Sequence, residues 1–166
     1  MPCQPKGGPR LEDVTLGIDL GSYSTRAALR TATGSEFVIE NKESMNSSNS
    51  YYAADFPSAI YPFDHVSQPV YLLSPDHSRR ETSAKYAFYV LAYADDKLLE
   101  EYAVAQRLTN RQNDPAFRKQ LRRGIVGLLT VVRDATMTVC RSKRYRIARI
   151  GLSIPVQWTS DFEDVY

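Results

Sequence analysis

The first forty residues constrain the fold of this chain more than any other part of it. Apolar and small or polar residues alternate over 14–20, which is the period-two pattern of a half-buried strand. Residues 21–24 are turn formers, and 26–30 return as a second strand. After another turn, 36–40 predicts a third strand. We therefore expect an antiparallel meander of three strands.

After residue 40 the sequence pattern changes twice, first to an aperiodic stretch with short strands and then to helical spacing. Residues 41–55 show no periodicity and predict a loop, and 56–61 and 70–73 predict short strands. Helical spacing of apolar residues then predicts a helix over 84–92, capped by Thr82 or Ser83, with a further helical stretch at 98–103.

Asp114 followed by Pro115 is a helix start signal, because a capping carboxylate precedes a proline at the first helical position. The apolar spacing continues to about Cys140. Gly124 and Gly127 inside this helix predict close packing on a sheet, since each glycine costs up to about 1 kcal/mol against alanine.

Two elements are expected after the long helix. Alternation over 146–154 predicts a strand that Pro155 stops, and the acidic run 161–164 predicts the first turn of another helix. Strands and helices in this order indicate the α/β class.

Length and composition predict one domain and a reducing compartment. The chain has 166 residues, 24% of them charged, and no apolar run long enough to span a membrane. Residues 1–13 predict a disordered tail without a signal peptide, followed by one domain over 14–166. The only cysteines, Cys3 and Cys140, form no disulfide framework, so we expect a cytoplasmic or nuclear protein.

Basic residues are concentrated late in the chain. Twelve Lys and Arg stand against two Asp between Arg107 and Arg149. Most of them fall on the polar side of the expected long helix and near its end, where they suit the helix dipole. We therefore do not expect nucleic acid as a partner, nor either lone histidine, His65 or His77, as a ligand or base.

The chemistry suggested by 16–25 is that of a phosphate site. Asp19 ends the first strand and Gly21 follows, which allows the backbone to approach an anion closely. Backbone amides of a tight turn form an anion-holding concavity, and the hydroxyls of Ser22 and Ser24 add donors. Asp19 itself requires a Mg²⁺ ion, reached through water, to face a phosphate favourably. The alternative is an ordinary hairpin whose side chains satisfy turn donors.

This segment resembles a known family motif. Residues 17–25, Gly-Ile-Asp-Leu-Gly-Ser-Tyr-Ser-Thr, look like the first phosphate motif of actin, sugar kinases and the seventy-kilodalton heat-shock chaperones. Residues 56–61 resemble the chaperones' Thr-Pro-Ser strand, and 150–155 with Trp158 resembles their strand ending in Val-Pro-Ala-Tyr-Phe. Together these segments resemble the N-terminal part of a divergent chaperone-like nucleotide-binding domain.

The resemblance implies an actin-like ATPase fold of the ribonuclease-H-like type, with 14–166 as its first lobe. It implies ATP and Mg²⁺ as cofactors and client proteins or co-chaperones as partners. Asp19 would be the catalytic residue that orients the Mg²⁺ hydration shell. Gly21, Ser22, Tyr23 and Ser24 would hold the β- and γ-phosphates, and Pro155 would relay nucleotide state to a partner domain.

The sequence also departs from the family. Tyr23 stands where the family has a threonine, and neither Lys85 nor Lys97 has the flanking residues of the family's catalytic lysine. The second carboxylate, the second phosphate loop and the adenosine-binding residues are expected beyond Tyr166. We therefore expect this chain to be inactive alone. The alternatives are a sugar-kinase-like phosphotransferase and a non-catalytic interaction module that kept the fold.

Overall fold

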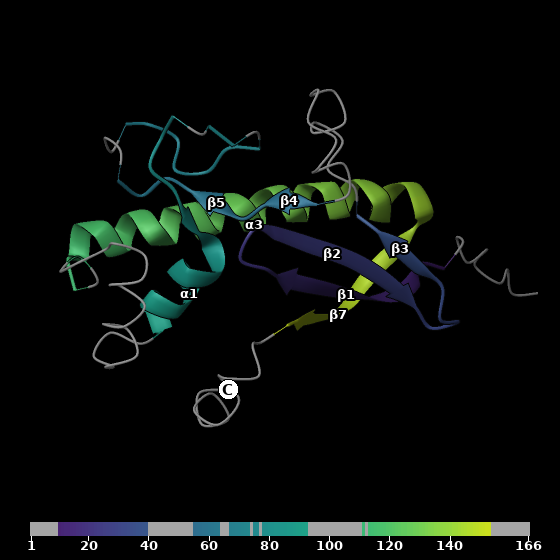
Figure 1. Cartoon of the computed structure of the whole chain (residues 1–166). Helices are drawn as coiled ribbons and strands as arrows, with labels where there is room; N and C mark the ends of the chain where they lie inside the picture. Colours follow the sequence, from purple (N-terminus) through teal and green to yellow (C-terminus); the bar gives the residue numbers. More distant parts are fainter. Residues whose placement is uncertain are drawn as a thin grey trace, which may run out of the picture.

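The computed structural model describes residues 10–39, 55–63, 67–73, 75–76, 78–92, 111 and 113–153 (Figure 1). Its elements are, in chain order, β1 (Glu12–Leu20), β2 (Ser24–Thr31), β3 (Glu36–Val38), β4 (Phe56–Pro57), β5 (Ala59–Ile60), β6 (Thr82–Ser83), α1 (Ala84–Ala92), α3 (Pro115–Lys143) and β7 (Tyr145–Leu152). The mixed α/β class and the opening meander are confirmed.

The main sheet has the strand order β3-β2-β1-β7. β1, β2 and β3 pair antiparallel in succession, whereas β7 pairs parallel with β1 on its other side. β4 adds to the same edge of β2 as β3, at the opposite end of that strand. The parallel pair brings the carboxyl ends of β1 and β7 to one end of the sheet.

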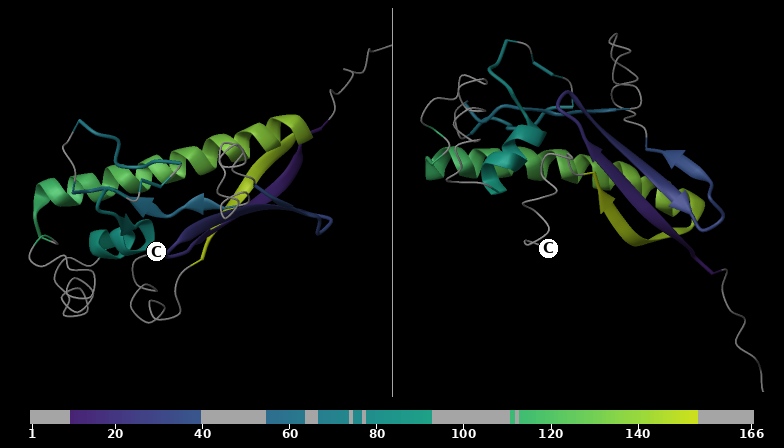
Figure 2. Two further views of the ribbon diagram at one scale, coloured as in Figure 1. Left: turned by 45° about the horizontal axis from the view of Figure 1, so that its top comes forward. Right: turned by 60° about the horizontal axis from the view of Figure 1, so that its bottom comes forward.

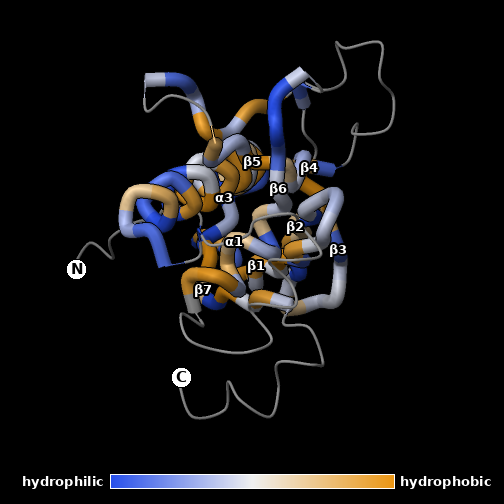
Figure 3. The backbone as a smooth tube through the Cα atoms, turned by 60° about the vertical axis from the view of Figure 1, so that its left-hand side comes forward, coloured by the Kyte–Doolittle hydropathy of each residue, from blue (hydrophilic) through white to orange (hydrophobic). Residues whose placement is uncertain are grey.

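The helix α3 covers one face of this sheet, as the views in Figures 1 and 2 agree. Alternate residues of β1 and β2 are buried toward it, and the helix contributes a buried stripe at helical spacing. This core includes Val14, Leu16, Leu29, Leu121, Leu128 and Val132. Figure 3 shows apolar stretches of the strands and of α3 close together, with strongly hydrophilic residues in the segment before β6.

Both ends of α3 have an identifiable physical cause. The Asp114 carboxylate accepts a hydrogen bond of 2.9 Å from the amide of Ala116, and Pro115 begins the helix as predicted. At the other end Arg144 takes a left-handed conformation, and its amide donates to the carbonyl of Cys140. The helix therefore runs three residues beyond the expected end.

The expected close packing of the two α3 glycines is confirmed. A Cβ at Gly124 would lie 2.8 Å from the Cβ of Ile60, and one at Gly127 would lie 2.8 Å from the Cβ of Tyr71. Ile60 and Tyr71 are themselves joined by an isolated β-bridge. The two glycines thus allow β5 and the bridged residue Tyr71 to pack closely on the helix.

The helix α1 is held at both ends. The Ser83 hydroxyl accepts a hydrogen bond of 3.0 Å from the amide of Tyr86, which makes Ser83 the cap among the two candidates. Arg118 on α3 donates to the carbonyl oxygens of Val90 and Leu91 at 2.7 and 3.0 Å. One guanidinium therefore satisfies carbonyls at the end of α1.

Some element boundaries differ from those expected. β1 begins at Glu12. Next to that start, Oδ1 of Asp13 forms an ion pair of 2.7 Å with Nε of Arg146 on β7. The expected strand 56–61 is divided at Ser58, whose amide donates to the carbonyl of Tyr23. The expected strand 70–73 is reduced to its bridge at Tyr71.

Several predictions fall outside the described residues. These are the tail over 1–9, the loop over 40–54, the helical segments at 98–103 and 161–164, both histidines, Cys3, Lys97, Pro155 and Trp158. In the part of the chain that is described, no helix combines the length and the apolar character needed to cross a membrane.

Candidate functional site

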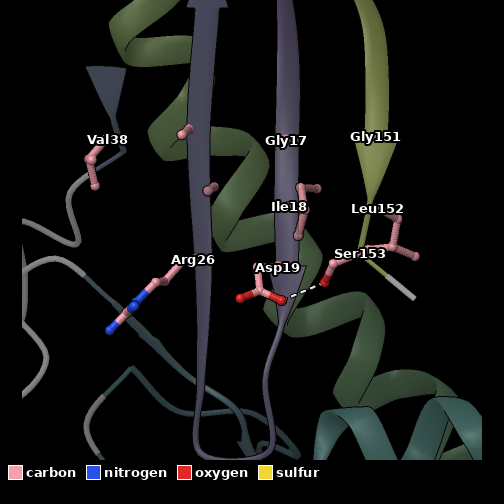
Figure 4. A pocket seen from close by; sticks show the side chains of 10 residues that line it. Gly17, Ile18, Asp19, Arg26, Val38, Gly151, Leu152 and Ser153 are labelled. Carbon is pink, nitrogen blue, oxygen red and sulfur yellow. Dashed lines mark hydrogen bonds between the residues drawn. The ribbon is translucent and has the colours of Figure 1, made fainter. Parts of the chain in front are cut away.

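The second face of the main sheet carries an open pocket of about 500 Å³ at the carboxyl ends of β1 and β7. Within the described ranges no helix covers this face, and the residues that point out from it are mostly exposed. The pocket is lined by Gly17, Ile18, Asp19, Arg26, Ala27, Ala28, Val38, Gly151, Leu152 and Ser153 (Figure 4).

The floor of the pocket is a row of small residues across three strands. Gly17 on β1 pairs with Ala28 on β2 and with Gly151 on β7. A Cβ at Gly151 would have no neighbour within 4 Å, and one at Gly17 would have only the carbonyl oxygen of Ala28 at 3.8 Å. Packing within the described chain therefore does not require glycine at either position. The two glycines leave the sheet backbone open to another molecule.

Asp19 stands at the rim of this floor, one pleat further along β1. Its Oδ1 accepts a hydrogen bond of 2.5 Å from the hydroxyl of Ser153, which follows β7. The amide of Ser153 donates to the carbonyl of Ile18 at 2.8 Å, so the backbone fixes the position of this serine. Figure 4 shows the other carboxylate oxygen of Asp19 directed away from Ser153.

The hairpin tip between β1 and β2 needs its glycine for an internal reason. A Cβ at Gly21 would lie 2.4 Å from the carbonyl oxygen of Ser24, and the amide of Gly21 donates to that same oxygen at 3.0 Å. The backbone amides of Ser22 and Tyr23 donate to no group in the described part of the chain. The Tyr23 side chain is 89% exposed and projects from the tip. The tip can therefore offer two amides to an anion.

The acidic residue Asp55 is hydrogen-bonded to β2. Asp55 accepts from the hydroxyl of Ser24 through Oδ2 at 3.0 Å and from Nε of Arg26 through Oδ1 at 2.9 Å. The hydrogen bond with Asp55, and then its negative charge, raise the pKa of Arg26. Figure 4 shows that the Arg26 side chain, which lies across the strand pair from Asp19, extends away from it.

Ser58 connects the hairpin to the rest of the fold. Its hydroxyl lies 2.8 Å from that of Thr25, and both side chains are fully buried. Its amide donates to the carbonyl of Tyr23, while its carbonyl accepts from the amide of Ala84 at the start of α1. The hairpin tip is therefore anchored to β4, β5 and α1.

The donor set allows Mg²⁺ only in a water-rich site. Among the described residues there is no group of three or more His, Cys, Asp or Glu side chains that could surround a metal ion. Among the described residues that line the pocket, Asp19 is the only carboxylate. This agrees with Mg²⁺ chemistry, because that ion keeps several waters and is usually bound by one or two carboxylates together with substrate phosphates.

The structure brings together most of the site residues predicted from the sequence. Asp19, Gly21, Ser22, Tyr23 and Ser24 lie at the same end of the sheet as the pocket. Asp19 lines the pocket itself, whereas the hydroxyl proton of Ser24 is donated to Asp55. Pro155 lies outside the described residues.

Sequence reasoning missed two neighbours of Asp19, Arg26 and Ser153, and it also missed Asp55, which bonds Ser24 and Arg26. Ser153 could have been found by pairing 146–154 parallel to 14–20, because the carboxyl ends of parallel strands meet. Asp55 carries no such signal, since its role depends on the pairing of β4 with β2. Searches against protein-family models, curated proteins and solved structures find no match for this chain.

Proposed function

We propose that this chain supplies one phosphate-binding wall of an ATP site of the actin-like type, within a chaperone-like ATPase. The observation that carries the proposal is the position of Asp19, at the rim of a sheet face that no described helix covers and whose floor is Gly17 and Gly151. The succession of meander, helices and further strand also agrees with what the sequence resemblance implies.

Backbone amides would contact the phosphates, and the Asp19 carboxylate would face the metal ion. The amides of Ser22 and Tyr23 are placed to donate to phosphate oxygens, and the open floor gives a polyphosphate chain access to the sheet backbone. Asp19, oriented by Ser153, would hold waters of a bound Mg²⁺ ion through its other oxygen. Such an ion would supply charge neutralisation for the phosphates, and catalysis of phosphoryl transfer consists mostly of positioning and electrostatics.

One wall gives weak binding. The resemblance implies that a second lobe contributes the other phosphate loop and the adenosine contacts, so we expect this chain alone to bind Mg·ATP only in the millimolar range and not to hydrolyse it. Micromolar affinity by calorimetry would contradict this expectation of a half site.

The binding site can be mapped on the isolated chain by amide NMR. Titration with millimolar ATP should shift the amides of Gly17, Gly151 and residues 21–24, and removing Mg²⁺ with a chelator should reduce the shifts. Asp19→Asn should remove the dependence on Mg²⁺ because a neutral amide holds metal-bound water poorly.

Asp13→Asn is the matched control for this experiment. Asp13 lies at the far end of β1 on the same sheet face and also bonds an arginine, Arg146. The proposal is wrong if the shifts fall elsewhere, or if Asp19→Asn and Asp13→Asn behave alike.

A non-catalytic binding module is the second candidate, and Tyr23 favours it. Its ring projects from the tip where the family places a small threonine, and no lysine lines the pocket among the described residues. ATP hydrolysis that appears only in a Tyr23→Thr variant supports this candidate. ATP hydrolysis by the protein with Tyr23 in place excludes it.

A further inference from the structure

Asp55 binds the donors on the return strand as an anionic ligand would. One carboxylate oxygen accepts from a hydroxyl, Ser24 Oγ, and the other accepts from a guanidinium nitrogen, Arg26 Nε. The Asp55 side chain is only 14% exposed, although the Arg26 side chain is 69% exposed. The carboxylate is therefore largely shielded from solvent where β4 pairs with β2, while the arginine that it bonds is not.

The same donors suit a phosphoryl group. Phosphate oxygens accept hydrogen bonds from hydroxyls, and arginine offers them paired N–H donors. The terminal amino groups of Arg26 donate to no other group within the described residues. Ser24 belongs to the hairpin next to the pocket, and Arg26 lines the pocket.

We propose that Ser24 and Arg26 form a phosphoryl-binding subsite that the Asp55 carboxylate occupies as an internal competitor. The inference rests on the proposed function, because it assigns a regulatory contact to the same hairpin. A polyphosphate that enters the pocket takes over the two donors, and Asp55 is released from both. The contact therefore weakens ligand binding by the cost of displacing Asp55.

That cost is small enough for exchange. An ion pair whose arginine is largely exposed contributes little to stability, because solvent screens it. The exposed Arg26 side chain can change rotamer within picoseconds to nanoseconds and so leave Asp55 for another anion. The arrangement can thus respond to an anion without rearrangement of the sheet.

Asp55→Asn tests the proposal, with inorganic tripolyphosphate as the probe. The variant removes the negative charge and keeps the side-chain size, so we expect tripolyphosphate to bind about two- to fivefold more tightly. Asp13→Asn, which breaks the other carboxylate–arginine pair on this face, should leave the affinity unchanged. Equal or weaker binding to Asp55→Asn would overturn the proposal.

A second measurement uses the natural chain and does not depend on how the variant folds. The Nε–Hε resonance of Arg26 should move as tripolyphosphate is added, whereas that of Arg30, exposed on the same strand, should not. A general charge effect would not move Arg26 alone. If the Arg26 resonance is unchanged at saturation, Asp55 is not displaced and the proposal is wrong.

The two proposals fail separately. If Asp19→Asn leaves Mg·ATP binding intact while Asp55→Asn tightens tripolyphosphate binding, the ATP function is wrong and the anion subsite stands. If Asp19→Asn removes the Mg²⁺ dependence while Asp55→Asn has no effect, the reverse holds.

Discussion

Gly17 and Gly151 are direct partners in the parallel pairing of β1 with β7, and neither is made necessary by a neighbouring atom. At the other described glycines an internal reason is present: tight contacts at Gly21, Gly124 and Gly127, and a φ of +88° at Gly34. Glycine inside a strand weakens the strand and often marks a site where a ligand or another backbone approaches closely. Two paired glycines that no packing contact requires therefore point to a molecule that approaches the sheet from outside. In our proposal that molecule is the bound polyphosphate.

Gly151→Val should therefore separate binding from stability. Valine favours the strand conformation, and a Cβ at this position meets no atom within 4 Å, so the free energy of unfolding should be unchanged or raised by up to about 1 kcal/mol. The added side chain fills the floor of the pocket, so the amide shifts caused by Mg·ATP should disappear. Urea unfolding and NMR titration measure the two effects.

Ala148→Val is the control for that variant. Ala148 is an exposed residue of the same strand and does not line the pocket. It should leave the ligand-induced shifts in place. Undiminished Mg·ATP binding by Gly151→Val would show that the glycine floor is not used.

Gly124→Ala should destabilise the protein, against the usual helix preference. In an unhindered helix this change gains up to about 1 kcal/mol. Here the new methyl would lie 2.8 Å from the Cβ of Ile60, which is too close to the backbone to rotate away. Overpacking of this kind costs about 1–3 kcal/mol, so we expect a net loss of about 1–2 kcal/mol in urea unfolding. Val126→Ala, on the exposed side of α3, should change stability by less than about 0.5 kcal/mol.

Tyr71→Phe should change the alkaline stability of the fold. The Tyr71 hydroxyl is buried without a hydrogen-bond partner in the described residues, and burial raises the pKa of Tyr71 above its ordinary value of 10.0. Above pH 10 the unfolded phenol loses its proton while the folded one keeps it, so stability falls as pH rises.

The phenylalanine variant lacks this titration. It should equal or exceed the natural chain in stability at neutral pH, and its advantage should grow above pH 10, as measured by urea unfolding across pH. An advantage that does not change with pH would show that the Tyr71 hydroxyl is not buried in solution.

The local sequence signals predicted the elements of this fold well. The alternation over 14–20, the turn at 21–24 and the Asp114–Pro115 start signal each act through neighbouring residues. The parallel placement of β7 beside β1 did not follow from them, because strand alternation does not specify a partner. The division at Ser58 likewise depends on the distant carbonyl of Tyr23.

The site was predictable to the same extent as the fold. Asp19 and the hairpin form one continuous motif, so they could be identified together. Ser153 and Asp55 come from segments that only the finished sheet brings to Asp19 and Ser24. The pairing of Gly17 with Gly151 carries no local signal, since each glycine alone resembles an ordinary interruption of a strand.

The parallel pairing of β1 with β7 also determines at what stage of folding the pocket forms. The hairpin of β1 and β2 closes over a few residues, whereas Asp19 and Ser153 are separated by 134 positions along the chain. Contacts at such separation carry a large loop-closure entropy and form late on average. The pocket is therefore assembled only when β7 joins the sheet. If the pocket binds a ligand as we propose, a chain that has formed only its hairpin cannot yet bind it, and binding would report that the sheet is complete.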